Sequence, residues 1–161
     1  MANCVSADIP IGGRLARSCY SELIEAIRND DPAVDWDGTP FDPGDIPVGK
    51  PLALMDHDVA NGCFEEIEEI CRRHGLHYVR WSGASPGSFP SVRIVYTGNG
   101  EPQQFLTTEE DEQVFSIERI RELGSIETIE ADYQRARRNP PPLVIVDDEP
   151  IDVVISEITD G

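Results

Sequence analysis

Basic side chains are scarce in this sequence of 161 residues, which has 13 Lys and Arg against 31 Asp and Glu and a formal net charge of −18. A chain with that charge repels nucleic acid and anionic membranes, so we expect it to bind neither directly. Long apolar runs are also missing, and none approaches the ~20 residues that span a bilayer. The N-terminus lacks the basic start and apolar core of a signal peptide, which predicts a cytoplasmic protein.

Sequence motifs with established chemistry are missing as well. The chain has no GxSxG, HExxH or phosphate-binding loop, so it matches none of these enzyme signatures. Its four cysteines, Cys4, Cys19, Cys63 and Cys71, lack CxxC spacing, and we expect free, mostly buried thiols in a reducing compartment. Two disulfides are the alternative if the chain is exported by another route. The sequence therefore predicts no metal and no cofactor.

A strand–helix–strand unit spans 51–83, and the rest of the sequence is organised around it. An apolar run at 52–55 predicts a buried strand that ends before three polar residues. Apolar residues at helical spacing follow in 61–74, with acids early and bases late, which suits a helix and its dipole. Residues 76–81 alternate as a second strand. Because a helix connects the two strands, we expect them to be parallel with a right-handed crossover.

Further elements flank this unit. Residues 5–11 alternate as a half-buried strand, Gly12-Gly13 predicts a tight turn, and an apolar stripe predicts a helix over 13–28. A Gly-Asn-Gly sequence further on predicts a two-stranded hairpin. Serine caps and apolar spacing predict a smaller helical pair over 116–138.

These elements together predict a fold class, α/β or α+β, with a mixed sheet of about five to seven strands. Two main helices, 13–28 and 61–74, and the smaller pair over 116–138 accompany the sheet. We predict a single domain over 1–142, followed by a strand-like segment or tail over 143–161.

The segment between the first helix and the strand–helix–strand unit is long and rich in Pro, Gly and Asp. Its acids do not fit the calcium-binding EF-hand pattern, because position 5 counted from Asp35 is Thr39 and position 6 is Pro40. We instead expect Trp36 and Phe41 to hold this loop on the sheet.

The acidic excess is concentrated in 101–161, which carries 16 acids and 5 bases. A field of that sign attracts basic proteins. Our first functional hypothesis is a non-enzymatic, acidic protein-binding module. It would be an inhibitor or nucleic-acid mimic of the anti-defence or immunity type, acting on a basic, nucleic-acid-handling partner. The acids assigned to the partner surface are Glu109, Glu110, Asp111, Glu112, Glu118, Glu122, Glu127, Glu130, Asp132, Asp147, Asp148 and Glu149.

The second functional hypothesis is a small hydrolase or transferase built on Asp56, His57, Asp58 and Cys63. His57 would act as the base and Cys63, near a helix N-terminus, as a thiolate nucleophile. Asp56 and Asp58 share one face of a strand and His57 the other, which disfavours one metal bound by all three. A third hypothesis is an acidic structural subunit whose charge serves only solubility.

Overall fold

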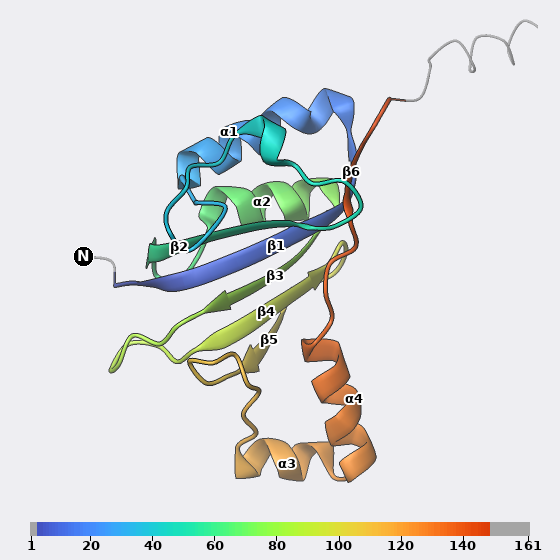
Figure 1. The fold of residues 1–161 in the computed structure, drawn as a ribbon. Coiled ribbons are helices and arrows are strands. Elements are labelled where there is room, and N and C mark those ends of the chain that lie inside the picture. The colour runs from blue at the N-terminus through green and yellow to red at the C-terminus, as the bar shows by residue number, and fades with distance from the viewer. Residues whose placement is uncertain (1–2, 149–161) are drawn as a thin grey trace, which may run out of the picture.

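A computed structural model describes residues 3–148, which fold into a six-stranded sheet with helices packed against it (Figure 1). The strands are β1 (Cys4–Ala16), β2 (Leu52–Ala60), β3 (His77–Ser82), β4 (Val92–Thr97), β5 (Gln103–Leu106) and β6 (Leu143–Val146). The helices are α1 (Tyr20–Asp30), α2 (Glu65–His74), α3 (Ile117–Leu123) and α4 (Ile126–Ala136). No helix of this range is long and apolar enough to cross a membrane.

The sheet has the strand order β2-β1-β3-β4-β5 with antiparallel neighbours, and β6 pairs in parallel with the end of β1. Because β2 and β3 are each antiparallel to β1, they run parallel to each other on either side of it, and α2 connects them. The predicted parallel pair is therefore present in direction, although its strands are not neighbours. The predicted hairpin is β4–β5. The fold class and the number of strands are confirmed, as an α+β arrangement.

β1 continues through Gly12 and Gly13, so the tight turn and the helix start predicted there are wrong. The helix α1 begins only at Tyr20, after a short 3₁₀ turn. The first glycine serves a close approach between backbones, since a Cβ at Gly12 would lie 1.7 Å from the carbonyl oxygen of Pro141. Gly13 donates its N–H to the carbonyl of Pro142 at 3.0 Å. These contacts seat the segment that leads into β6.

β2 does not end at Met55, as predicted, but continues to Ala60. The polar residues 56–58 therefore lie within the strand and not in a loop beyond it. β2 is the first strand of the sheet order, and an edge strand tolerates polar side chains because one of its sides is open to solvent.

α2 begins later than the predicted cap, Asn61. Asn61 and Gly62 instead form a left-handed turn after β2, with φ values of 55° and 69°. The carboxylate of Asp30 accepts the N–H groups of Glu66 and Ile67 in the first turn of α2, and the carboxylate of Glu68 accepts the N–H of Phe64 at 2.7 Å. The Glu68 side chain is buried.

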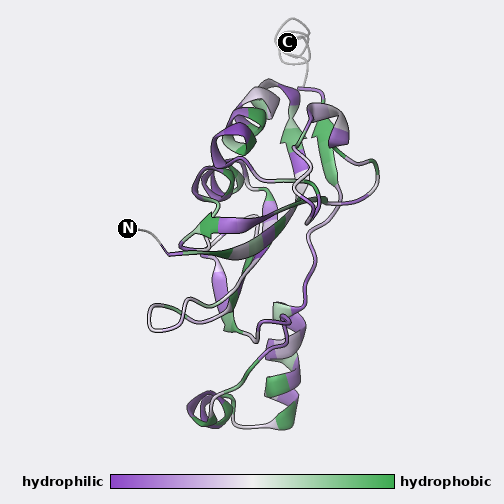
Figure 2. Ribbon diagram, turned by 60° about the vertical axis from the view of Figure 1, so that its left-hand side comes forward, coloured by the Kyte–Doolittle hydropathy of each residue, from purple (hydrophilic) through white to green (hydrophobic). Residues whose placement is uncertain are grey.

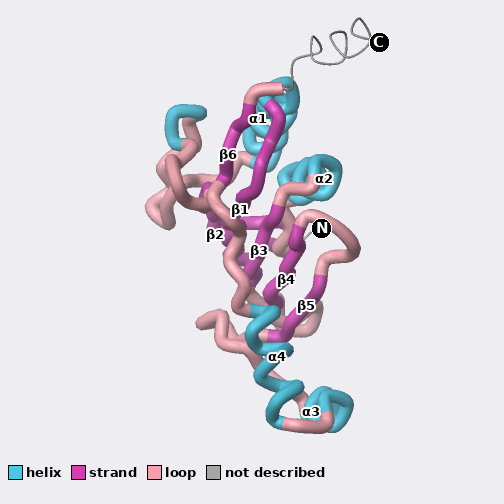
Figure 3. The backbone as a smooth tube through the Cα atoms, turned by 90° about the vertical axis from the view of Figure 1, so that its right-hand side faces the viewer, coloured by secondary structure: helices cyan, strands magenta, loops and turns pink. Residues whose placement is uncertain are grey.

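The main core lies between the sheet and the helices α1 and α2. Its fully buried side chains include Ile9, Ile11, Leu23, Ile27, Leu54, Phe64, Ile67, Leu76 and Tyr78. A smaller cluster consists of Val79, Val95, Phe105 and Ala136. Adjacent strand residues such as Tyr78 and Val79 point to opposite faces of a sheet. α1 and α2 therefore cover one face, and the end of α4 touches the other, while α3 and α4 project beyond β5 (Figure 3).

The loop between α1 and β2 is held by its two aromatic residues, as the sequence predicts. The ring of Trp36 lies 4.8 Å from the ring of His57 on β2. Phe41 packs against the main core. The loop thereby lies against the edge strand.

The four cysteines are free thiols. Cys71 is buried, Cys19 and Cys63 are partly exposed, and Cys4 is exposed. The sequence predicted mostly buried thiols, but only Cys71 is fully buried among the four.

Candidate functional site

The projecting pair of helices, α3 and α4, is built from local signals that the sequence displays. The hydroxyl of Ser116 accepts the N–H of Arg119 at 3.1 Å and caps α3. Gly124, with φ 78°, ends that helix in the left-handed conformation. Ser125 then accepts the N–H of Thr128 at 3.2 Å and caps α4. The predicted helical pair is confirmed, and we call it the α3–α4 hairpin.

Asp132 joins the parts of the α3–α4 hairpin from inside. Its side chain is 2% exposed. One carboxylate oxygen accepts from Arg119 of α3 at 2.8 Å and from Arg135 of α4 at 2.7 Å. The other accepts from the amide of Gln113 at 3.0 Å. The sequence placed Asp132 on the partner surface, but this prediction is wrong because a buried side chain cannot contact a partner. Asp132 instead stabilises the hairpin from inside.

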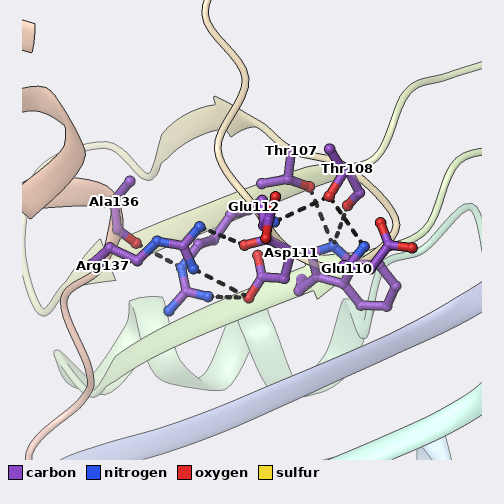
Figure 4. A network of polar contacts seen from close by, with 9 residues as sticks. Thr107, Thr108, Glu110, Asp111, Glu112, Ala136 and Arg137 are labelled. Carbon is purple, nitrogen blue, oxygen red and sulfur yellow. Dashed lines mark hydrogen bonds and ion pairs between the residues drawn. The ribbon is translucent and has the colours of Figure 1, made fainter.

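A second carboxylate, Asp111, anchors the hairpin to the sheet (Figure 4). It forms an ion pair with the buried Arg93 of β4, which also donates from Nε to the carbonyl of Ala136 at 2.6 Å. Arg137 donates to the backbone carbonyl of Asp111 at 2.5 Å, and its guanidinium lies 5.4 Å from the ring of Tyr133. Asp111 is thus neutralised by two arginines.

Other acids assigned to the partner surface also have partners within the chain. Glu109 accepts the N–H of Ala84 and the hydroxyl of Ser91, both at 2.8 Å. Asp147 pairs with Arg17 at 2.7 Å. The remaining engaged acids are Asp148, which accepts the N–H of Ser18, and Glu122, which pairs with Arg119. Glu149 lies outside the described residues.

Five of the assigned acids remain exposed and form no ion pair with any part of residues 3–148. They are Glu110, Glu112, Glu118, Glu127 and Glu130. All five lie on the α3–α4 hairpin or on the connector that leads into it. The structure therefore brings this subset together in one region and leaves Asp147 and Asp148 near α1.

The α3–α4 hairpin also exposes large apolar side chains. Nine such side chains are exposed among residues 3–148, and six of them lie between β5 and α4. The six are Leu106, Val114, Ile117, Ile120, Ile126 and Tyr133. Ile126, at the start of α4, is 70% exposed. Figure 2 shows hydrophobic segments on the projecting helices, away from the core.

Two grooves accompany this apolar surface. One, of about 450 Å³, is lined at the turn between the helices by Ile120, Ile126 and Ile129. The other, of about 420 Å³, lies between β5, the connector and α3, and its lining includes Phe105 and Phe115. Arg121 also lines the first groove, whereas Glu118, Glu122 and Arg119 line the second.

The structure does not bring the four residues of the second candidate site into one cavity. The ring of His57 donates from Nε2 to the carbonyl of Trp36 at 2.9 Å, and its Nδ1 faces the hydroxyl of Ser6 at 3.4 Å. Asp56, Asp58 and Cys63 line a different cavity of about 280 Å³, which His57 does not line. The proposed base, His57, therefore does not share this cavity with the proposed nucleophile, Cys63.

Burial raises the pKa of the Cys63 thiol above its ordinary value, and the positive charge of Arg80 offsets this only in part. Cys63 also precedes α2, which begins two residues later, so the helix start does not produce the expected thiolate. The hydrolase hypothesis gains no support from this geometry.

Some features were missed by reasoning from the sequence. Residues 20–69 hold fourteen acids but only two bases, Arg28 and Lys50. They form α1, the following loop, β2 and the start of α2. A running count of charge along the chain would have found this stretch, which is denser in acid than 101–161.

The fold and the site together define an α+β protein whose sheet carries a projecting, partly apolar helical hairpin, with five acids and three bases over 117–136. Comparisons with protein-family models, with curated proteins and with solved structures found no match for the chain.

The carboxyl group of Asp8 on β1 should make the stability of the protein depend on pH. Burial and the charge of Asp111 raise its pKa from 3.8 to about 6, although Arg93 and a backbone N–H of Trp81 act in the opposite direction. The native state therefore holds this proton up to a higher pH than the unfolded chain does. Stability due to this group is highest below pH 3.8 and falls as the pH rises toward about 6.

We expect Asp8→Asn to stabilise the protein by about 2 kcal/mol at pH 7 and to have little effect near pH 4. Urea unfolding between pH 4 and 8 measures the difference from wild type. Asp37→Asn, which removes an exposed carboxylate of the neighbouring loop, is the control and should show no such trend. A constant difference between Asp8→Asn and wild type at all pH values would contradict the prediction.

Proposed function

We propose that this chain is a non-enzymatic, acidic protein-binding module that binds a basic, nucleic-acid-handling partner in the cytoplasm through its α3–α4 hairpin. The observation that carries the proposal is the concentration of exposed apolar side chains on the element that also carries the unpaired carboxylates. Large exposed apolar patches rimmed by polar groups mark interaction surfaces in soluble proteins.

The chemistry of the hairpin suits a protein interface. Such interfaces have an apolar, desolvated centre and a polar rim. Here Ile117, Ile120 and Ile126 supply apolar surface, and the exposed carboxylates of Glu118, Glu127 and Glu130 lie on the same two helices, together with the exposed Arg119 and Arg121. Charge complementarity then selects a partner with Lys and Arg around an apolar contact.

Nucleic-acid-handling proteins present such basic surfaces. Duplex DNA carries one charge per ~1.7 Å of axis, and a face dense in carboxylates competes for the same Lys and Arg side chains. An inhibitor of the anti-defence or immunity type would act in this way. The acidic stretch 20–69 supports the proposal, because a strongly negative field accelerates encounter with a basic partner.

The rigidity of the hairpin also supports binding. Asp132 fixes α3 against α4, and Asp111 with Arg93 fixes α4 to the sheet. A surface that is ordered before binding loses less conformational entropy when the complex forms.

The test begins by using the full chain to isolate a partner from the host and then measures binding of the purified pair. Ile117→Ser and Ile126→Ser should each weaken the complex by about 10-fold or more, because they remove apolar anchors. Val144→Ser, at an exposed apolar residue of β6 outside the hairpin, is the control and should bind like wild type. Duplex DNA should compete with the chain for the partner.

Charge is tested with two variants of equal net charge. One carries Glu118→Lys, Glu127→Lys and Glu130→Lys, and the other carries Glu25→Lys, Asp37→Lys and Glu101→Lys at exposed sites elsewhere. The first variant should bind the partner much more weakly than the second, and its affinity should depend less on salt concentration. Equal losses in both, or unchanged binding by the isoleucine variants, would overturn the proposal.

A further inference from the structure

Three side chains that can bind a metal ion converge where α1 begins and α2 ends. The Sγ of Cys19, a carboxylate oxygen of Glu22 and a ring nitrogen of His74 all lie within 4.8 Å of one another. The Nε2 of His74 is 2.5 Å from the Oε2 of Glu22. No other such group occurs within the part of the chain that the structure describes.

The fold brings these residues together from distant positions. Cys19 is the residue before α1, and Glu22 lies three positions later, in the first turn of that helix. Residues three apart lie on the same side of a helix. His74 is the last residue of α2, which packs beside α1. All three are partly exposed, so an ion can reach them from solvent.

The types of the three ligands restrict the ion. Calcium and magnesium prefer shells of oxygen atoms, whereas one thiolate, one imidazole and one carboxylate form a set that zinc accepts in tetrahedral geometry. Three protein ligands leave one position of the tetrahedron open. We propose that Cys19, Glu22 and His74 bind one Zn²⁺ ion, with a water molecule or an exogenous ligand in the fourth position.

An ordinary ion pair between Glu22 and His74 accounts for only two of the three groups. It leaves unexplained why a thiol lies beside that pair. Cys19 is the residue before α1, and its Sγ lies within ligand distance of both other groups. The two arginines that precede His74 are directed to Glu69, at 3.4 and 3.5 Å, and not to Glu22.

Binding has a defined proton balance. Zn²⁺ displaces the proton of the Cys19 thiol to solvent. The proton between Nε2 of His74 and Glu22 also leaves, to solvent or by a shift to Nδ1, so that Nε2 binds the ion as a neutral imidazole. The Glu22–His74 contact opens to roughly 3.3 Å, the separation that two ligands at ~2.0 Å from a tetrahedral ion require. The acidic stretch 20–69, with two bases among its fifty residues, raises the local concentration of cations.

This site is separate from the proposed function, because it lies at the α1–α2 end and not on the α3–α4 hairpin. Bound zinc would join the two helices that cover the main core. The sequence alone predicted no metal, because His74 is 52 residues from Glu22 and no short motif contains both.

The test uses the full chain after treatment with a chelator and titrates it with Zn²⁺ and, for spectroscopy, with Co²⁺. We expect one equivalent to bind, a thiolate-to-cobalt charge-transfer band to appear, and Zn²⁺ to raise the Tm. Cys19→Ser and His74→Ala should each weaken binding by roughly 100-fold, since even a residue that only supports a ligand contributes 10–100-fold.

Cys4→Ser and His57→Ala are matched controls, because they remove an exposed cysteine and an exposed histidine away from the cluster. Both should bind like wild type. Glu22→Gln keeps the shape of the side chain and serves as the second ligand variant if Cys19→Ser does not fold by circular dichroism. Absence of a charge-transfer band, or the same affinity in the ligand and control variants, would overturn the proposal.

Discussion

Arg80→Met is expected to destabilise the protein by about 3–5 kcal/mol, because it leaves a carboxylate buried without its cation. The side chains of Arg80 and Glu68 are 8% and 7% exposed, and Nε of the arginine lies 3.1 Å from Oε2 of the acid. The two atoms are close enough to form an ion pair, but the N–H of this Nε is not aligned for a hydrogen bond. Arg80 also donates from Nη1 to the hydroxyl of Ser82 at 2.9 Å. Urea unfolding at pH 7 measures the loss.

The pH dependence identifies the cause of this loss. Burial raises the pKa of Glu68 and the charge of Arg80 lowers it, so removal of the arginine raises this pKa further. Above that pKa the native state must hold an unpaired charge, and below it the acid is neutral. The destabilisation by Arg80→Met should therefore shrink as the pH is lowered.

Two further variants complete the test. Glu68→Gln combined with Arg80→Met should recover most of the lost stability, because no buried charge remains. Arg73→Met removes a cation from an exposed pair on α2 and should cost at most about 1 kcal/mol. If Arg80→Met costs no more than Arg73→Met, the buried pair does not stabilise the fold as argued.

Gly12→Ala is the second substitution with a large expected effect. The added Cβ would lie 1.7 Å from the carbonyl oxygen and 2.8 Å from the carbonyl carbon of Pro141, and backbone atoms cannot move aside as a flexible side chain does. The segment before β6 must then leave β1. We expect a loss of about 3 kcal/mol, at the upper end for overpacking.

Hydrogen exchange locates this effect. Gly12→Ala should increase exchange at Gly13 and Leu143, whose N–H groups bond to Pro142 and Lys50 in the native structure. Gly44→Ala is the control, because the nearest atom to its added Cβ is a side-chain oxygen at 3.2 Å and its φ is not positive. Native-like exchange and stability of Gly12→Ala would show that β6 does not require this close contact.

The parts of the fold that depend on local signals were predictable. Ser116, Gly124 and Ser125 set the ends of α3 and α4 through contacts within four residues, so their positions follow from the sequence. The β4–β5 hairpin likewise follows from its turn. The course of β1 could not be predicted in this way. The backbone carbonyl of Pro141, which is 129 residues away, fills the space where a side chain at Gly12 would lie.

The candidate site was predictable in its charge but not in its geometry. The sequence shows how many acids a segment holds, whereas burial and arginine partners decide which of them reach a partner. Asp111 and Asp132 look like Glu118 in the sequence, yet each binds two arginines inside the structure. The proximity of Cys19 to His74 could not be predicted from the sequence either, because only the packing of α1 on α2 brings the two side chains together.

The attachment of the α3–α4 hairpin has a dynamic consequence. The end of α4, Ala136, packs in a small cluster with three buried apolar residues of the sheet, and the attachment also relies on the ion pairs of Asp111 with Arg93 and Arg137. An attachment of that kind weakens with salt and with acid, whereas the main core does not depend on either in the same way. The protein should therefore open in two stages, with the helices detaching as a unit while the sheet and its cover of α1 and α2 stay folded.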